Sequence, residues 1–121
     1  ETGTEGCIVN VSSMLSRRVG MGVSLYSMSK AAIRHLTAGH ALEWAKYGIR
    51  VNALCPGYIR TSINEEYWDT DLGKAELAKL PRARVGVPAD LDSALLFLVD
   101  PRSHFVNGEA LIVDDAQSWA I

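Results

Sequence analysis

The chain has 121 residues, of which 48% are hydrophobic and 21% charged, a balance typical of a folded globular domain rather than a disordered segment. Its net charge of −2 supplies no basic surface for nucleic acid and no polybasic patch for a membrane. No apolar run approaches the roughly 20 residues that span a membrane. We therefore expect neither a nucleic-acid nor a membrane partner.

The cysteines and histidines argue against a metal site. Cys7 and Cys55 are too few for a disulfide framework or a zinc site, and each stands at one end of an apolar run. We expect both to be small buried residues in a reducing, cytoplasmic compartment. His35 and His40 are five residues apart on an expected helix and so point to different faces, and His104 lies beside no carboxylate cluster.

The first expected element is a strand. The chain begins at Glu1, with neither a methionine nor a signal peptide, so we expect an excerpt that starts close to a strand. Residues 7–11 form a mostly continuous apolar run, which predicts a strand covered on both faces. Residues 12–23 read as a loop because Gly20 and Gly22 interrupt them.

A long helix is expected over residues 24–47, with Ser24 as its N-cap and Gly48 just beyond its end. Its apolar residues lie on more than one side, so more than one side must be buried. Residues 49–54 predict a second strand, which Pro56 and Gly57 stop. A strand, a long helix and a strand at this spacing predict a right-handed parallel crossover.

The rest of the chain repeats this alternation. Residues 58–88 are polar and contain a probable short helix at 71–80. Pro88 begins another helix, which Pro101 ends, and Asn107 with Gly108 makes a turn before a strand at 110–113. The order β-α-β-α-β predicts an α/β fold with a parallel sheet, and we expect residues 1–121 to form a single partial domain.

The most informative residues are a serine, a tyrosine and a lysine. Tyr26 and Lys30 stand one turn apart if the segment is helical. A phenol has an unperturbed pKa of about 10, and a neighbouring ammonium favours the phenolate and lowers that pKa. Ser13, which closes the first apolar run, can offer a hydroxyl to the same oxygen that the phenol serves. This pattern indicates acid–base chemistry.

Four motifs in order resemble the C-terminal half of a classical short-chain dehydrogenase/reductase. Residues 8–13 resemble the strand that leads to that family's serine, and Tyr26-Ser27-Met28-Ser29-Lys30 matches its Tyr-x-x-x-Lys motif. Residues 50–57 resemble the next strand with its Pro-Gly ending, and residues 108–114 the last strand. The resemblance implies the C-terminal part of a Rossmann-like parallel sheet with flanking helices.

The resemblance also implies roles for these residues. Tyr26 would be the general acid/base for a carbonyl or alcohol oxygen, Lys30 would support it and bind the nicotinamide ribose, and Ser13 would hold the substrate oxygen. The implied cofactor is NAD or NADP. Its contacts in this chain would be Tyr26, Lys30 and the Pro-Gly-x-x-x-Thr segment, through Pro56, Gly57, Ile59 and Thr61.

Parts of the family pattern are missing or altered. The Gly-rich turn, the residue that reads the adenosine ribose and the family's upstream catalytic asparagine are all absent, so NAD and NADP are not distinguished. Asp114-Asp115-Ala116 stands where glycines are usual, which leaves the course of the C-terminal tail open. We expect an unpaired first strand, and 121 residues that alone are poorly soluble or partly folded and do not reduce carbonyls.

Residues 58–88 resemble the family's variable substrate loop, a lid over the pocket. Met14, Tyr67 and Trp68 are candidates to line the substrate site, although aromatics on a short lid helix are about as often packing anchors. We interpret Asn10 and Asn52 as structural ties between strands and loops. Ser13 alone could simply bond its own backbone, and Thr61 could belong to any turn. Lys30 could be a solvated helix lysine, but the apolar residues around it indicate a largely buried setting: Met28, Ala31, Ala32 and Ile33. Arg60 is a possible contact for an anionic group, but a solvent-facing position is the favoured interpretation. We also expect surface positions for Arg82 and Arg84.

The favoured function is an NAD(P)-dependent oxidoreductase that interconverts a small-molecule ketone and a secondary alcohol, with a homodimer or homotetramer at full length. One alternative is a non-catalytic remnant or interaction subunit, against which Ser13, Tyr26 and Lys30 all argue. The other is an epimerase or dehydratase of the wider superfamily, which shares Tyr-x-x-x-Lys.

Overall fold

The structure is a computed structural model that describes residues 4–121, so the start at Glu1 lies outside the described part. A parallel sheet of three strands has the order β1-β2-β3, formed by Gly6–Val11, Ile49–Pro56 and Ala110–Val113. Ile8 lies opposite Val51, and Leu54 lies opposite Leu111. This arrangement confirms the expected parallel α/β fold.

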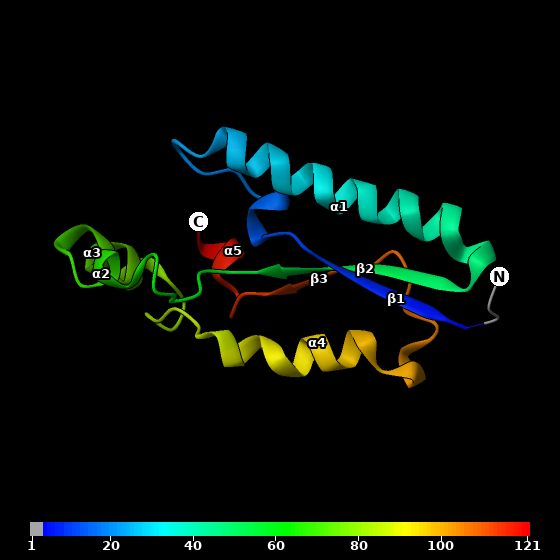
Figure 1. Ribbon diagram of the computed structural model, residues 1–121. Helices are drawn as coiled ribbons and strands as arrows, with labels where there is room; N and C mark the ends of the chain where they lie inside the picture. Colours follow the sequence, from blue (N-terminus) through cyan, green and yellow to red (C-terminus); the bar gives the residue numbers. More distant parts are fainter. Residues whose placement is uncertain (1–3) are drawn as a thin grey trace.

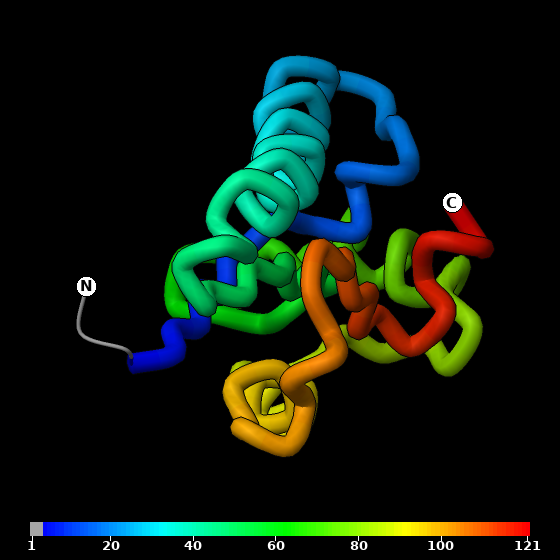
Figure 2. The backbone as a smooth tube through the Cα atoms, turned by 90° about the vertical axis from the view of Figure 1, so that its right-hand side faces the viewer, coloured from blue at the N-terminus to red at the C-terminus, as the bar shows by residue number. Residues whose placement is uncertain are grey.

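Two helices cover opposite faces of the sheet. α1 (Ser24–Trp44) lies along one face and α4 (Asp92–Val99) along the other, as the two views agree (Figures 1 and 2). α1 continues through the short 3₁₀ helix η2 (Ala45–Tyr47) and ends at Gly48, whose φ of 74° is the left-handed conformation that favours glycine. The expected N-cap is wrong, because Val23 occupies that position and Ser24 is already helical.

Short helices gather at the end of the sheet where the strands finish. α2, α3 and α5 lie there, beyond the carboxyl ends of the strands (Figure 1). The short elements are η1 (Met14–Ser16), α2 (Glu65–Trp68), α3 (Asp71–Lys79), η3 (Pro88–Leu91), η4 (Pro101–Ser103) and α5 (Gln117–Ala120). α3 confirms the helix expected at residues 71–80, whereas the sequence does not predict α2.

The core centres on β2. Val51, Ala53 and Cys55 are fully buried between the two helical layers, and Leu98 of α4 packs beneath them. The expected burial of β1 on both faces is wrong: Val11 is 57% exposed and Cys7 is exposed as well. Within residues 4–121 no strand lies beyond β1, so its outer side has no cover.

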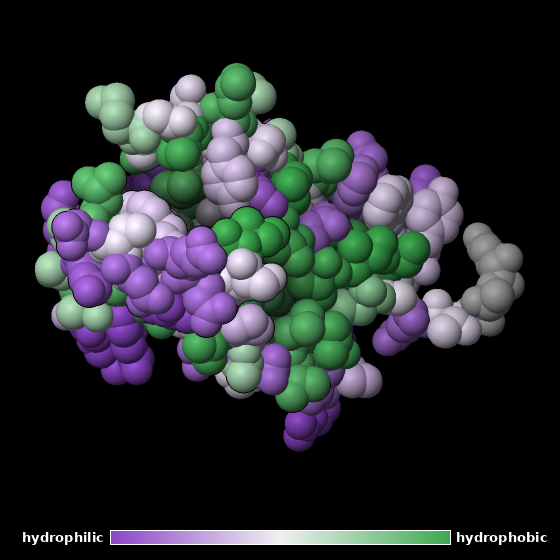
Figure 3. Space-filling view, turned by 60° about the vertical axis from the view of Figure 1, so that its left-hand side comes forward, coloured by the Kyte–Doolittle hydropathy of each residue, from purple (hydrophilic) through white to green (hydrophobic). Residues whose placement is uncertain are grey.

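α1 is also covered on one side only within the described residues. Leu36 is 52% exposed and Leu42 82% exposed, although the sequence predicts burial on more than one side. Hydrophobic side chains gather across the middle of one face of the molecule (Figure 3). This exposure agrees with the expectation that a missing neighbour leaves an apolar patch.

Polar residues in the strands tie the sheet to its surroundings, as expected. The Asn10 side chain donates to Thr37 Oγ1 of α1 at 3.0 Å. The Asn52 side chain donates to the Val106 carbonyl at 2.9 Å and accepts from the Glu109 N–H at 2.9 Å. The Asn52 bonds hold the loop before β3 against β2, and the Asn10 bond holds α1 against β1. Both asparagines are therefore structural.

Candidate functional site

A cavity of about 600 Å³ lies at the carboxyl ends of β1 and β2. In open parallel sheets this end is where ligands bind. The cavity brings together most of the residues singled out from the sequence: Ser13, Met14, Tyr26, Lys30, Pro56, Gly57, Ile59 and Thr61 all line it. Segments far apart in the sequence, from Val11 at the end of β1 to Leu91 just before α4, therefore meet at one site.

Ser13 lies directly after β1 at the cavity wall and is 7% exposed. Its Oγ accepts a hydrogen bond from the Leu15 N–H at 3.1 Å and so caps η1. A hydroxyl that accepts this bond still carries its own hydrogen to donate. The local structural role anticipated for Ser13 is therefore present, and it leaves the O–H available to an oxygen in the cavity.

Tyr26 and Lys30 lie one turn apart on α1, and Lys30 Nζ is 5.6 Å from the centre of the Tyr26 ring. Lys30 Nζ donates to the Val11 carbonyl at 3.3 Å, which turns the ammonium toward the end of β1. Ser12 Oγ donates to the Lys30 carbonyl at 2.7 Å and fixes the helix against the strand. The pair is thus held at the cavity by β1.

The surroundings of this pair are more open than the sequence predicts. Tyr26 is 48% exposed and Met28 is 62% exposed, where we expect a largely buried setting. Of the apolar residues around Lys30, Met28 and Ala32 are exposed, whereas Ala31 and Ile33 are partly covered. The expectation of burial is therefore wrong for the described chain.

The Pro56–Gly57 turn requires its glycine. A Cβ at Gly57 would lie 2.4 Å from Gln117 Oε1 and 2.6 Å from Asp114 Cβ, so a larger residue would displace the C-terminal tail. Gly57 N–H donates to the Val113 carbonyl at 3.0 Å, which joins the turn to β3. The tail therefore packs directly on the turn expected to face the cofactor.

Asn64 is a site residue that the sequence reasoning missed. Its Oδ1 accepts from the Thr61 N–H at 2.8 Å and its Nδ2 donates to the Ile59 carbonyl at 2.9 Å. Asn64 also lines the cavity. An asparagine three residues after a turn threonine is a recognisable signal for such a side-chain-closed turn.

Trp68 and its aromatic neighbours pack on one another. Trp68 is 3% exposed and packs edge-to-face on Tyr58 and Tyr67, with ring centres 5.5 and 5.1 Å apart. Neither Tyr67 nor Trp68 lines the cavity, so of the three substrate-loop candidates only Met14 does. Burial, with the nearby Glu76 carboxylate, raises the pKa of Tyr58 to about 12.

The C-terminal tail turns where the family usually has glycines. Asp115 and Ala116 adopt left-handed φ values of 51° and 64°, a conformation that glycine enters freely. Asp115 pairs with Arg84 at 2.9 Å and Arg82 at 2.8 Å, and hydrogen bonding to Arg84 lowers the pKa of the Asp115 carboxyl. Both arginine side chains are more than half exposed, as expected of surface residues.

Arg60 is less exposed than expected of a surface residue: its side chain is 32% exposed, and its Nη1 lies 3.9 Å from Asp69 Oδ1. Within residues 4–121, no three histidine, cysteine or acidic side chains gather as they would around a metal ion. The same part of the chain contains no helix long and apolar enough to cross a membrane.

The comparisons with known proteins agree with this geometry. Residues 1–115 match the family model described as Enoyl-(Acyl carrier protein) reductase. The chain is 41% identical to the 2-dehydro-3-deoxy-D-gluconate 5-dehydrogenase of Dickeya dadantii over 93% of its own length and 45% of the relative's.

Solved structures give the same result. A gluconate 5-dehydrogenase from Burkholderia cenocepacia, in complex with NADP and tartrate, superposes with a TM-score of 0.88 at 35% identity over 97% of this chain and 46% of that one. A 4-hydroxyisoleucine dehydrogenase mutant complexed with NADH and succinate has a TM-score of 0.87 at 32% identity over 93% and 47%.

The chain thus spans a little under half the length of the relatives it matches. The family match covers almost the whole chain, and the Ser13, Tyr26 and Lys30 positions meet at one cavity. The chain belongs to the short-chain dehydrogenase/reductase family, within the group that the enoyl-(acyl carrier protein) reductase model describes.

Proposed function

We propose that the complete protein in which this chain occurs is an NAD(P)-dependent oxidoreductase that interconverts a carbonyl and a secondary alcohol. The observation that carries the proposal is the convergence of Ser13, Tyr26 and Lys30 on one cavity beside the Pro56–Gly57 turn. Phenol, ammonium and hydroxyl groups at one wall of a cavity are suited to moving a proton on and off a substrate oxygen.

The proposed role of each of the three side chains follows from its hydrogen-bonding capacity and charge. Ser13 O–H donates to the substrate oxygen and stabilises the charge that develops there. Tyr26 gives its proton to that oxygen during reduction and takes it back during oxidation. Lys30 places a positive charge 5.6 Å from the centre of the Tyr26 ring and stabilises negative charge that develops on the reacting oxygens.

The residues present fit a nicotinamide cofactor. Within the described residues Lys30 has no carboxylate partner, and its ammonium has two more hydrogens to donate, for example to ribose hydroxyls. The Pro56–Thr61 segment borders the same cavity, with the Thr61 hydroxyl at its far end. When bound, the cofactor supplies or accepts a hydride. NAD and NADP are both proposed, because the relatives carry one or the other.

The names of the relatives support a proposal for the substrate class. The relative from Dickeya and the structure from Burkholderia are named for gluconate-type sugar acids. We propose that this protein's substrate is likewise a small ketone or secondary alcohol of the polyhydroxy-acid kind. The three acid–base residues disfavour a remnant without catalysis, and relatives named as dehydrogenases favour hydride transfer over an epimerase or dehydratase.

The wider organisation is part of the same proposal. Residues 1–121 form the C-terminal half of a nucleotide-binding fold, and residues 58–88 form its lid. The free cysteines Cys7 and Cys55 suit a reducing cytoplasm. A homodimer or homotetramer at full length is carried over from the family resemblance alone.

The test replaces the proposed proton donor. In the complete protein, Tyr26→Phe should lower kcat by at least about 1,000-fold in NADH or NADPH oxidation with a ketone panel, while cofactor affinity stays within about twofold. Tyr67→Phe is the matched control, because Tyr67 lies on the lid outside the cavity, and it should keep its turnover. Near-normal turnover by Tyr26→Phe would sink the assigned role.

A further inference from the structure

The lid is rooted in two short segments that lie side by side. Residues 58–60 leave the Pro56–Gly57 turn, and residues 84–86 return from the lid. Ile59 and Gly86 form an isolated parallel bridge, in which Arg60 N–H donates to the Gly86 carbonyl at 2.7 Å and Gly86 N–H donates to the Tyr58 carbonyl at 2.9 Å. We call these two segments the lid roots. The outgoing root contains Tyr58 and Ile59, which line the proposed catalytic cavity.

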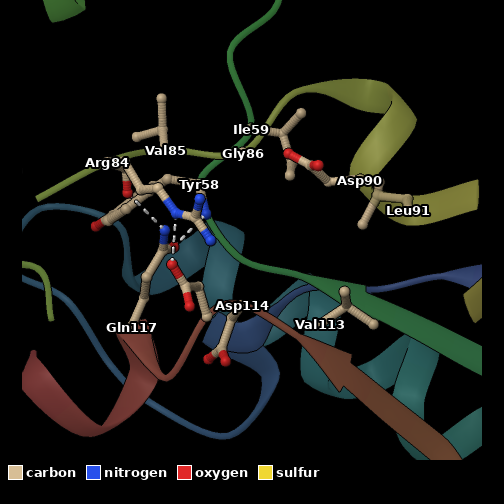
Figure 4. Close-up of a pocket in the computed structure, with 11 residues that line it drawn as sticks. Tyr58, Ile59, Arg84, Val85, Gly86, Asp90, Leu91, Val113, Asp114 and Gln117 are labelled. Atoms are coloured by element: carbon tan, nitrogen blue, oxygen red, sulfur yellow. Dashed lines mark hydrogen bonds and ion pairs between the residues drawn. The ribbon is translucent and has the colours of Figure 1, made fainter. Parts of the chain in front are cut away.

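One side chain from the C-terminal tail bonds both lid roots. Gln117, the first residue of α5, is 2% exposed. Its Oε1 accepts from the Tyr58 N–H at 2.7 Å and its Nε2 donates to the Arg84 carbonyl at 3.2 Å. Figure 4 shows the Gln117 amide reaching from the tail toward Arg84 and Tyr58. The Tyr58 N–H and the Arg84 carbonyl belong to different roots, so the amide works as a clamp.

Hydrogen bonds within the C-terminal tail hold the Gln117 amide in this position. Asp114 ends the β3 edge, its carbonyl accepts from the Gln117 N–H at 2.9 Å, and its carboxylate accepts from the Ser118 N–H at 2.9 Å. Asp115 holds the return root a second time through Arg84. A separate cavity of about 310 Å³ lies beside the clamp and shares Tyr58 and Ile59 with the catalytic cavity. The outgoing root is therefore a common wall of both cavities, whereas the return root lines only the smaller one.

We propose that Gln117 is a positioning residue for the catalytic site: its side-chain amide holds the two lid roots together and thereby fixes the Pro56–Gly57 turn and the base of the lid. The bond to Tyr58 N–H fixes the residue directly after Gly57. The bond to Arg84 sets where the lid returns. The effect on turnover rests on the proposed oxidoreductase function, whereas the clamp itself does not.

The experiment breaks the clamp at constant size in the complete protein. Gln117→Met keeps the length of the side chain and removes both polar atoms, which leaves the Tyr58 N–H unsatisfied. Amide hydrogen exchange at Tyr58 and Gly86 should accelerate at least about tenfold. The cofactor dissociation constant and the substrate KM should each rise about tenfold with kcat within about twofold, because binding geometry changes and the reacting groups do not.

Ser118→Ala is the matched control. Ser118 follows Gln117 in the same helix, is fully buried, and its Oγ accepts from the Arg17 guanidinium at 2.8 Å without touching either lid root. This variant should lower the stability of the tail and leave exchange at Tyr58 and Gly86 unchanged. Equal acceleration in both variants would overturn the clamp, since packing of the tail alone would explain it. Unchanged exchange and KM in Gln117→Met would overturn it as well.

Two further arms keep the outcomes distinct. Should Gln117→Met not fold, Gln117→Glu keeps an acceptor for Tyr58 N–H and loses the donor to Arg84, so exchange should accelerate at Gly86 and not at Tyr58. Acceleration at both or neither would contradict the clamp. Faster exchange in a protein that turns over no carbonyl substrate would support the clamp and refute the proposed function.

Discussion

The two outer strands of the sheet are finished in different ways. β1 has six residues, and two of its apolar side chains, Ile8 and Val11, are 38% and 57% exposed. β3 has four residues, all partly covered, and the chain after it folds back over the sheet through Asp114 and Gln117. A short outer strand followed by a bonded tail is a common way to protect a sheet edge.

The difference identifies which side of the sheet this chain completes. All four residues of β3 are partly covered and the chain after it packs on the Pro56–Gly57 turn, whereas β1 presents exposed apolar side chains. Neither strand has a described partner on its outer edge. The relatives are about twice as long, and the shared region covers only 45% of the Dickeya relative. We infer that the remainder of the family fold covers β1 and the exposed part of α1.

The largest expected effect comes from testing the β1 side directly. Residues 1–121 expressed alone should be poorly soluble or partly folded and should turn over no carbonyl substrate, because apolar surface stays exposed on β1 and α1. Circular dichroism on heating and size-exclusion chromatography measure this. The complete protein is the control and should unfold cooperatively. A soluble 121-residue monomer with a sharp transition would show that β1 needs no cover.

A pair of matched truncations sharpens the comparison. In the complete protein, Ile8→Ala in β1 and Ile112→Ala in β3 should each cost about 2–5 kcal/mol of unfolding free energy, the usual range for truncating a buried isoleucine. Chemical denaturation measures both. A cost below about 0.5 kcal/mol for Ile8→Ala, with the full cost for Ile112→Ala, is the pattern of an exposed β1.

The sequence predicts this fold well because its signals are local. The run at residues 110–113, the left-handed Gly48 and the turn at Gly108 all fall where expected. Tyr26 and Lys30 follow from helical spacing alone, and their meeting with Ser13 follows from parallel strands that end at one edge.

The remaining features depend on contacts between distant segments. Gln117 and Tyr58 are 59 positions apart, and no periodicity or motif pairs a tail glutamine with a turn amide. The exposure of Cys7 depends on which part of the chain lies beyond β1. The apolar run around Cys7 indicates that the strand is covered, but it does not indicate which segment covers it. The packing role of Trp68 depends on its contact with the Tyr58 ring, and the fold of residues 58–68 brings the two rings together.

The smallest expected effect on stability concerns the turn that follows β3. Ala116 adopts a φ of 64° where the family usually has glycine, and a left-handed alanine costs about 1 kcal/mol. Ala116→Gly should therefore raise the stability of the complete protein by about 0.5–1 kcal/mol, or about 1–4 °C in Tm. Ala38→Gly, in the interior of α1, is the control of opposite sign and should lower stability by about 1 kcal/mol. If Ala116→Gly lowered Tm as Ala38→Gly does, the left-handed turn at Ala116 would not be what brings Gln117 back onto the lid roots. The position of the tail would then depend on its side-chain bonds alone.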